Sequence, residues 1–274
     1  MHALGADGVP ATPRFAVVLI ATWNVNSLNA RMPRVQEWIA EVQPDVLCLQ
    51  ETKMSDAQFP AMDFQHLGYD SVHHGQGRWN GVAILSRVGI EDPVYGFEDG
   101  DEPDPDARIV WARCNGVRVC SVYVPNGRAL DDDHYQYKLA WLARLRAVLD
   151  ERHSPEELLV ILGDWNVTPA DDDVWSPKAF EGSTHVSAPE RDAIAALRDW
   201  GLVDTLRERY PESGIYSYWD YRNGDFHKRR GMRIDYLLST PALAQHCRAD
   251  LIDRNARKGT KPSDHAPVLA DFDL

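Results

Sequence analysis

The chain has 274 residues, of which 44% are hydrophobic, and its formal net charge is −13 at pH 7. This length supports a sizeable buried core, and no linker rich in Pro, Gly and Ser divides the middle of the chain. The acidic balance excludes a protein that holds nucleic acid through a broad basic coat, although Lys and Arg cluster locally at 228–230, at 233 and at 254–261.

The N-terminal segment, residues 1–14, contains Gly, Ala and Pro without periodicity, and we expect a flexible leader there. A single folded domain is predicted for residues 15–274. The apolar run from Phe15 to Ala21 is too short to span a bilayer and lacks the layout of a signal peptide. The cysteines lack zinc-ligand spacing; they are Cys48, Cys114, Cys120 and Cys247. We therefore expect a soluble, reduced, cytoplasmic protein without a membrane partner.

Hydrophobic spacing predicts an alternation of helices and strands. Val35, Trp38, Ile39 and Val42 recur at helical spacing and predict a helix over 34–42, ended by Pro44 and Asp45. Further helices are predicted over 135–149 and 192–200. Short apolar runs predict buried strands at 17–20, 46–50, 82–85, 117–124, 158–162, 234–238 and 268–272. This order favours an α/β (α+β) class with mixed sheets covered by helices, in two halves of similar layout.

Polar side chains stand at the ends of many of these apolar runs, and we expect the strands to deliver them to one common edge. They are Asn24, Asn26, Glu51, Asp164, Asn166, Asp235, Asp264 and His265. Carboxylates and amides with a single imidazole and no thiol suit Mg²⁺ or Mn²⁺ rather than zinc. Such an ion polarises a phosphoryl oxygen and stabilises a leaving alkoxide. The pattern favours hydrolysis of a phosphodiester by activated water.

Each of these residues also has a simpler interpretation when it is taken alone. Glu51 could be a solvated strand end, and Asp164 after Gly163 could be a turn or helix-capping residue. The asparagines could form turns, Tyr123 could be a core side chain, and His265 could belong to a surface pair. These separate explanations do not account for the order in which the residues occur along the chain.

That order closely resembles the exonuclease III family of DNA-repair nucleases, within the DNase I-like superfamily of endonucleases, exonucleases and phosphatases. The resemblance runs from residue 17 to the C-terminus. Any one of the matching motifs is common among proteins, whereas all six in this order are specific to the family. The matching stretches are Ala21-Thr22-Trp23-Asn24-Val25-Asn26, Leu49-Gln50-Glu51-Thr52-Lys53, Val122-Tyr123-Val124-Pro125-Asn126-Gly127, Leu162-Gly163-Asp164-Trp165-Asn166-Val167, Gly231-Met232-Arg233-Ile234-Asp235 and Lys261-Pro262-Ser263-Asp264-His265-Ala266-Pro267-Val268.

The resemblance implies a four-layered sandwich of two mixed β-sheets flanked by helices, and it assigns roles to individual residues. It implies a Mg²⁺ site, with Mn²⁺ as a substitute, formed by Asn24, Glu51, Asp164, Asn166, Asp264 and His265. The implied catalytic groups are Tyr123, Asp164, Asn166, Asp235, Asp264 and His265. Among them, Asp235 would hold the imidazole of His265. The sequence leaves open whether Asp164, His265 or Tyr123 takes the proton from water.

The resemblance also implies where DNA would bind. An extruded abasic sugar fits a small apolar slot that a normal nucleotide cannot enter, and the candidates for this slot are Tyr218, Trp219, Met232 and Ile234. Ordinary core packing is the alternative for the aromatic residues. Contacts to backbone phosphates are expected from Lys53, Asn126, Arg128, Arg222 and Arg233. The segment 75–81, which contains Arg78 and Trp79, is either a DNA-facing loop or a simple hairpin turn, and the second interpretation is favoured.

The sequence therefore predicts a Mg²⁺-dependent, monomeric nuclease of base-excision repair. Its expected activities are 3′ to 5′ exonuclease action on duplex DNA and incision 5′ to abasic sites. One alternative is a related phosphodiesterase that acts on a phospholipid headgroup or an inositol phosphate. Another is a non-catalytic DNA-binding protein, which would be expected to lack one or more ionisable site residues.

Overall fold

Two six-stranded β-sheets form the centre of the computed structural model, which describes residues 17–97 and 99–274. The predicted leader, residues 1–14, lies outside the described residues. In spatial order, the first sheet contains β11 (Cys247–Ile252), β12 (Val268–Asp273), β1 (Val17–Asn24), β2 (Val46–Gln50), β4 (Val82–Ser86) and β3 (Asp70–His74). The second contains β5 (Glu91–Tyr95), β6 (Ile109–Cys114), β7 (Val117–Tyr123), β8 (Leu159–Asp164), β10 (Asp235–Ser239) and β9 (Val203–Asp204).

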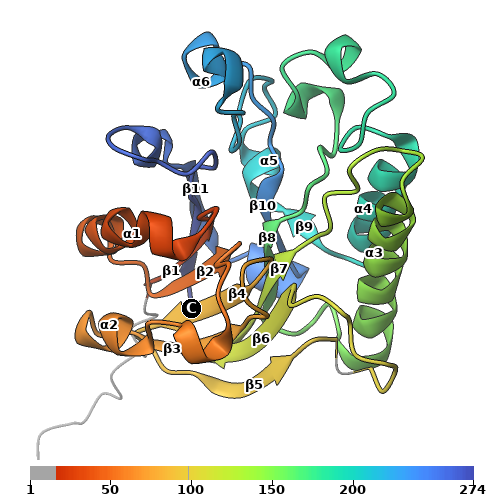
Figure 1. Cartoon of the computed structure of the whole chain (residues 1–274). Coiled ribbons are helices and arrows are strands. Elements are labelled where there is room, and N and C mark those ends of the chain that lie inside the picture. Colours follow the sequence, from red (N-terminus) through yellow and green to blue (C-terminus); the bar gives the residue numbers. More distant parts are fainter. Residues whose placement is uncertain (1–16, 98) are drawn as a thin grey trace, which may run out of the picture.

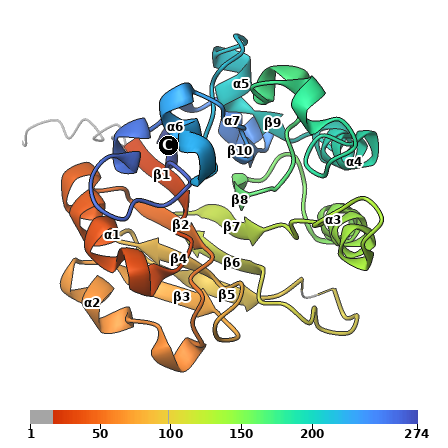
Figure 2. The same cartoon turned by 45° about the horizontal axis from the view of Figure 1, so that its top comes forward.

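The four longest helices cover the outer faces of the two sheets (Figures 1 and 2). The longer helices are α1 (Leu28–Val42), α2 (Ala61–His66), α3 (Asp133–Arg152) and α4 (Ala188–Asp199), and the shorter ones are α5 (Thr205–Arg209), α6 (Asp225–Lys228) and α7 (Pro241–Ala244). Single turns of 3₁₀ helix occur at Asp56–Gln58, Asp171–Asp173, Pro177–Phe180, Arg222–Gly224 and Arg254–Arg257. In both views α1 and α2 lie on one side of the sandwich, and α3 and α4 lie on the other.

The period-two alternation of strand side chains explains these four layers. In β1, Val18 and Ile20 pack between the sheets, whereas Ala21 and Trp23 pack against α1. β8 is likewise buried on both faces, because its alternate residues enter the core between the sheets and the core beneath α3. The predicted α/β sandwich is therefore confirmed.

Both sheets have the same central arrangement, which agrees with the predicted halves of similar layout. β1 and β2 run parallel and are connected through α1, and β7 and β8 run parallel and are connected through α3. The other strand pairs are antiparallel, so both sheets are mixed. The last strand, β12, lies between β11 and the first strand, β1.

This topology gathers the polar strand ends. In each parallel pair the last residues are in register, so Asn24 lies beside Gln50 and Tyr123 lies beside Asp164. β10 runs in the opposite direction to β8 and begins at Asp235, which is paired with Asp164. The ends of strands that are far apart in sequence thus meet at one edge of the sandwich.

The predicted elements are present, with some changes at their ends. The first helix begins at Leu28 rather than at Arg34, because Ser27 caps it and Pro33 is accommodated inside it. The segment 75–81 connects the antiparallel strands β3 and β4, so the hairpin interpretation is confirmed. The cysteines are free thiols, as expected. Within the part of the chain that the structure describes, no helix combines the length and apolar character needed to cross a membrane.

Candidate active site

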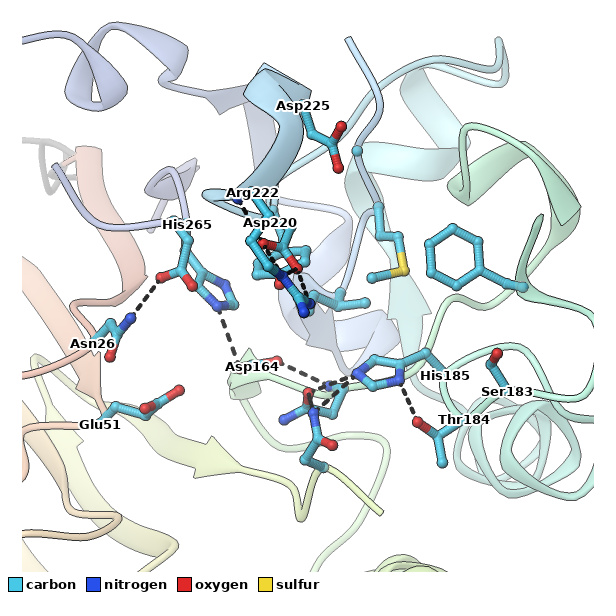
Figure 3. Close-up of a pocket in the computed structure, with 18 of the residues that line it drawn as sticks. Asn26, Glu51, Asp164, Ser183, Thr184, His185, Asp220, Arg222, Asp225 and His265 are labelled. Carbon is cyan, nitrogen blue, oxygen red and sulfur yellow. Dashed lines mark hydrogen bonds and ion pairs between the residues drawn. The ribbon is translucent and has the colours of Figure 1, made fainter. Parts of the chain in front are cut away.

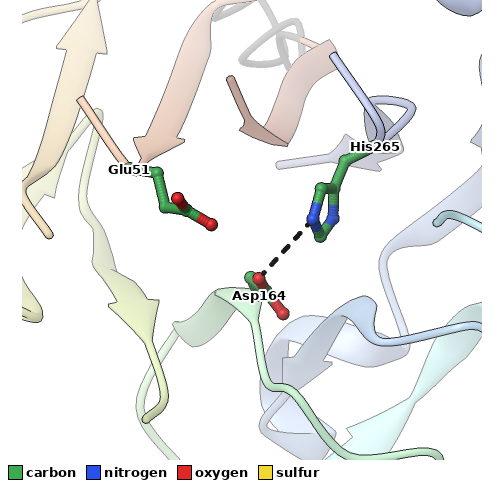
Figure 4. Close-up of side chains that lie close together, drawn as sticks. All are labelled: Glu51, Asp164 and His265. Atoms are coloured by element: carbon green, nitrogen blue, oxygen red, sulfur yellow. Dashed lines mark ion pairs between the residues drawn. The ribbon is translucent and has the colours of Figure 1, made fainter. Parts of the chain in front are cut away.

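Glu51, Asp164 and His265 lie together at the gathered strand ends. They come from the segment after β2, from the end of β8 and from the segment before β12. One ligand atom from each of the three lies within 4.8 Å of the other two. Figure 4 shows the three side chains directed toward one shared space. The expected convergence of distant acids and an imidazole is therefore present.

The side chain of Asn24 forms hydrogen bonds with two of these acids. Its amide nitrogen donates to Glu51 Oε1 and to Asp164 Oδ2, each at 2.8 Å. Its amide oxygen accepts from the backbone N–H of Asn26 at 2.9 Å and keeps a second lone pair. This buried side chain orients the two carboxylates, and its role as a metal ligand stays a prediction.

Asp235 holds the imidazole of His265, as the resemblance implied. The Nδ1 atom of His265 lies 2.8 Å from Asp235 Oδ2, and Ser217 donates to the same carboxylate oxygen at 2.7 Å. The other ring nitrogen, Nε2, lies 3.8 Å from Asp164 Oδ2. Burial lowers the pKa of His265, but the carboxylates of Asp235 and Asp164 outweigh burial and raise the pKa to about 10. The imidazole is therefore a cation at neutral pH.

The surroundings of the Asp164 carboxyl group raise its pKa. Burial raises its pKa to about 7, and the nearby carboxylates of Asp235 and Glu51 act in the same direction, against the opposing effect of His265. The carboxylates of Glu51 and Asp164 face a common space and create a negative potential that a divalent cation would neutralise. The oxygen donors of Glu51 and Asp164 therefore fit a hard metal ion, while a protonated His265 offers it no lone pair.

The surroundings shift the pKa values of Glu51 and Tyr123 in opposite directions. Burial raises the pKa of Glu51, but the charge and hydrogen bond of Lys53 outweigh burial, and the pKa falls below its ordinary value. Lys53 Nζ lies 2.8 Å from Glu51 Oε2. Burial, together with Glu51, raises the pKa of the Tyr123 phenol well above its ordinary value. The phenol of Tyr123 therefore keeps its proton at neutral pH and can donate a hydrogen bond, and the guanidinium of Arg108 lies 4.8 Å from its ring centroid.

Asn166, Asn126 and His185 form the opposite side of the site. Asn126 Nδ2 donates to Asn166 Oδ1 at 3.2 Å, and His185 Nε2 lies 3.1 Å from the same oxygen. Burial lowers the pKa of His185 to about 3, with a further contribution from the charge of Lys138, so this imidazole is neutral. Sequence reasoning missed His185, because it belongs to no motif and lies in the loop before α4.

A cavity of about 560 Å³ lies at the site, and its lining includes Glu51, Asp164, Asn166, His185 and His265. Figure 3 shows Glu51, Asn26 and His265 on one side of Asp164, and His185, Thr184 and Ser183 on the other. Of the predicted sugar-slot residues, Tyr218, Met232 and Ile234 line the cavity, accompanied by the aromatic rings of Trp175 and Phe180. The cavity thus combines a charged floor with an apolar wall.

Two predicted DNA-facing residues require correction. Trp219 is 1% exposed and packs between Phe226 and Arg254 rather than lining the cavity. Arg233 has no exposed surface, and its guanidinium forms ion pairs with Asp173 and Asp204. A buried, doubly paired guanidinium is unavailable to a DNA phosphate. The remaining candidates, Lys53, Asn126, Arg128 and Arg222, all line the cavity.

Asp264 lies at the rim of the same cavity. Its Oδ1 atom accepts a hydrogen bond from Asn26 Nδ2 at 3.1 Å, so the first and last polar segments of the site are in direct contact. The fold and site together define a hydrolase of phosphate esters, because two acids, a carboxylate-held imidazolium and a phenol surround one cavity.

Comparison with known proteins places this hydrolase in a family. Residues 21–265 match the model of the endonuclease/exonuclease/phosphatase family. Exodeoxyribonuclease III of Haemophilus influenzae is 33% identical over 263 residues, which cover 92% of this chain and 98% of the relative. An AP endonuclease structure from Archaeoglobus fulgidus has a TM-score of 0.91 at 39% identity and covers 94% of this chain and 100% of its own.

A Neisseria 3′ phosphatase, solved with a product DNA hairpin, has a TM-score of 0.89 at 42% identity, over 94% of this chain and 100% of that one. The chain belongs to the endonuclease/exonuclease/phosphatase family and, within it, to the exonuclease III group. It is a DNA-repair nuclease, a hydrolase whose substrate is DNA.

Proposed function

We propose that this nuclease hydrolyses phosphodiesters at two kinds of position in duplex DNA: at 3′ ends, in the 3′ to 5′ direction, and 5′ to abasic sites. The products are a 3′-hydroxyl and a 5′-phosphate. The observation that carries the proposal is the cluster of Glu51, Asp164 and His265 on the floor of a cavity that also has an apolar wall. The Neisseria relative named as a 3′ phosphatase supports action at 3′ ends.

The pKa values favour a division of roles among the catalytic groups. The imidazolium of His265 donates to a non-bridging phosphate oxygen, and the phenol of Tyr123 donates to the same phosphate. With a pKa of about 7, the carboxylate of Asp164 is matched to accept the proton of the attacking water near neutral pH. Asn166 orients that water from the side of His185.

We further propose Mg²⁺ as the metal, held by Glu51 with Asp264 at the rim. A bound Mg²⁺ would supply charge neutralisation at the phosphoryl oxygen and the leaving alkoxide. Asn24 and Lys53 hold the carboxylate of Glu51 in place for this ion. A monomeric state and a cytoplasmic location stay predictions.

Recognition of DNA is assigned to the cavity and its rim. Arg128 and Arg222 are exposed, and with Lys53 and Asn126 they would contact backbone phosphates without reading sequence. Tyr218, Met232 and Ile234 would receive the sugar that lacks a base, because these side chains form the apolar wall.

A time course on duplex DNA with one internal abasic analogue tests the proposal. Nicks and end-trimming are read from the same gel, with Mg²⁺ and with excess EDTA, and lipid micelles serve as the substrate that should remain intact. Nicking at the analogue together with shortening from the 3′ end, both abolished by EDTA, is the expected result. Metal-independent cleavage, or hydrolysis of lipid in place of DNA, would falsify the proposal.

A further inference from the structure

A fully buried ion pair lies behind the cavity, on the side of His185. Lys138 belongs to α3 and Glu190 to α4, and neither side chain has any exposed surface. Burying an ammonium and a carboxylate is costly, and their mutual attraction recovers that cost only when further hydrogen bonds satisfy both groups. The partners of these hydrogen bonds indicate what the pair does.

Lys138 contacts two loops of the active site. Its Nζ atom donates to the backbone carbonyl of Asn166 at 2.6 Å and to that of Asn126 at 3.3 Å. These are the segments that follow β8 and β7. One ammonium group thus holds the main chain of both asparagines whose amides face the cavity.

Glu190 contacts the third loop. Its Oε1 atom, which is paired with Lys138, accepts the backbone N–H of His185 at 2.9 Å. Its Oε2 atom accepts the hydroxyl of Ser187 at 2.6 Å. The ion pair therefore connects the backbones of Asn126, Asn166 and His185 through one buried centre.

The side chains of these three residues meet on the cavity side of that centre. His185 Nε2 lies 3.1 Å from Asn166 Oδ1 and 3.2 Å from Asn126 Nδ2, and Asn126 donates to Asn166. The triangle of side chains is consequently fixed at its backbone by Lys138 and Glu190. Loss of the pair would free three loops at once.

We propose that Lys138 and Glu190 are positioning residues of the nuclease: their ion pair holds the Asn126, Asn166 and His185 loops in the arrangement in which their side chains meet the substrate. The kinetic part of this inference rests on the proposed function. A purely structural role, in which the pair only joins α3 to α4, predicts lower stability with unchanged turnover. A positioning role predicts lower turnover in a protein that is still folded.

The double variant Lys138→Met/Glu190→Leu tests this distinction, because it removes both charges at similar volume and leaves no lone buried ion. We expect a native circular dichroism spectrum, a kcat on abasic duplex lower by about 10- to 100-fold, and a KM that changes much less. Backbone amide hydrogen exchange at His185 should accelerate, because its N–H loses Glu190. Should the double variant not fold, Lys138→Met/Glu190→Gln serves in its place, because it also leaves no lone buried ion and keeps an acceptor for the N–H of His185; a smaller loss of kcat is then expected.

Leu145→Ala is the matched control. Leu145 is a fully buried core residue of the same helix and does not line the cavity, so its truncation should lower the melting temperature with kcat unchanged. Wild-type kcat and wild-type amide protection of His185 in the double variant would overturn the inference. If the wild-type protein does not cleave DNA, the proposed function fails, while exchange at His185 still decides whether the pair holds its loop.

Discussion

Asp164 and Asp235 face each other in register across β8 and β10, and the imidazole of His265 is close to both carboxylates. The backbone pairing of two strands thus fixes the separation of two acids that act on one imidazole. Asp235 takes the Nδ1 side and leaves Nε2 directed toward Asp164 and the cavity.

Asp235→Asn should lower kcat on abasic duplex by about 10- to 100-fold, because the imidazole loses the group that charges and orients it. The pKa of His265, now raised by Asp235, should fall. Turnover measured from pH 5 to 10 checks both effects: the variant should lose activity at a lower alkaline pH than the wild type. An unchanged alkaline limb would contradict the assigned role of Asp235.

Asp164→Asn should be nearly inactive yet more stable at neutral pH without metal. The folded state keeps a proton on Asp164 up to about pH 7, whereas an ordinary Asp releases it near 3.8. The stability contributed by this group is therefore complete below about pH 4 and is lost as pH rises through 7. Denaturant unfolding in EDTA at pH 4 and pH 7 measures the difference between variant and wild type, which should shift in favour of the variant at the higher pH. If the difference in the free energy of unfolding is the same at both pH values, folding does not raise the pKa of Asp164.

His185→Ala should lower the ratio of abasic incision to 3′-end trimming, because a wider cavity also admits a nucleotide that keeps its base. The imidazole lines the cavity opposite Glu51, so its removal enlarges the space available to the sugar beside Asn166. Both activities are measured on one labelled duplex, with His153→Ala as a control because His153 stacks on Trp111 away from the cavity. Equal changes in the two rates would mean that the His185 side chain does not limit the space beside Asn166.

Arg233→Met should destabilise the fold by about 3–5 kcal/mol, because the buried Asp204 loses its cation and Asp173 keeps only Arg207. The affinity of the remaining folded protein for DNA should change little. Denaturant melts and fluorescence titration with duplex DNA separate the two quantities. A stable variant with weak DNA binding would restore the original prediction that Arg233 contacts phosphate.

Arg222→Ala should behave in the opposite way. Arg222 is exposed at the cavity rim and paired with Asp220, so its loss should leave the free energy of unfolding close to that of the wild type. The KM for duplex DNA should rise, and the slope of log affinity against log salt should decrease by about 1. A salt slope identical to that of the wild type would remove Arg222 from the DNA interface.

The sequence revealed the strands that are buried on both faces, because continuous apolar runs are rare outside a sheet core. It did not reveal β3, β5, β9 and β11, which lie at or next to sheet edges and carry polar residues, as in Asp70–His74. β6 was missed although it is buried. Edge strands are specified by pairing with a neighbour, and that information is not present in their own residues.

The acids and imidazole of the site were predictable because strand ends hold them in fixed motifs. The orientation of Asn24, the burial of Arg233 and the presence of His185 were not. Each depends on a partner more than 15 residues away: Glu51 and Asp164 for Asn24, Asp173 for Arg233, and Asn166 for His185. Residue type gives the chemistry of a side chain, whereas such tertiary contacts decide which way it faces.

The pairing of β12 with β1 has a consequence for how the enzyme is made. Val17 at the start of β1 is opposite Asp273 at the end of β12, and the segment just before β12 carries Asp264 and His265. Because synthesis runs from the N-terminus, His265 can join the other catalytic groups only after β1, β2 and β8 have been made. A nascent chain that ends before Asp264 therefore lacks both an acid and the imidazole of the site.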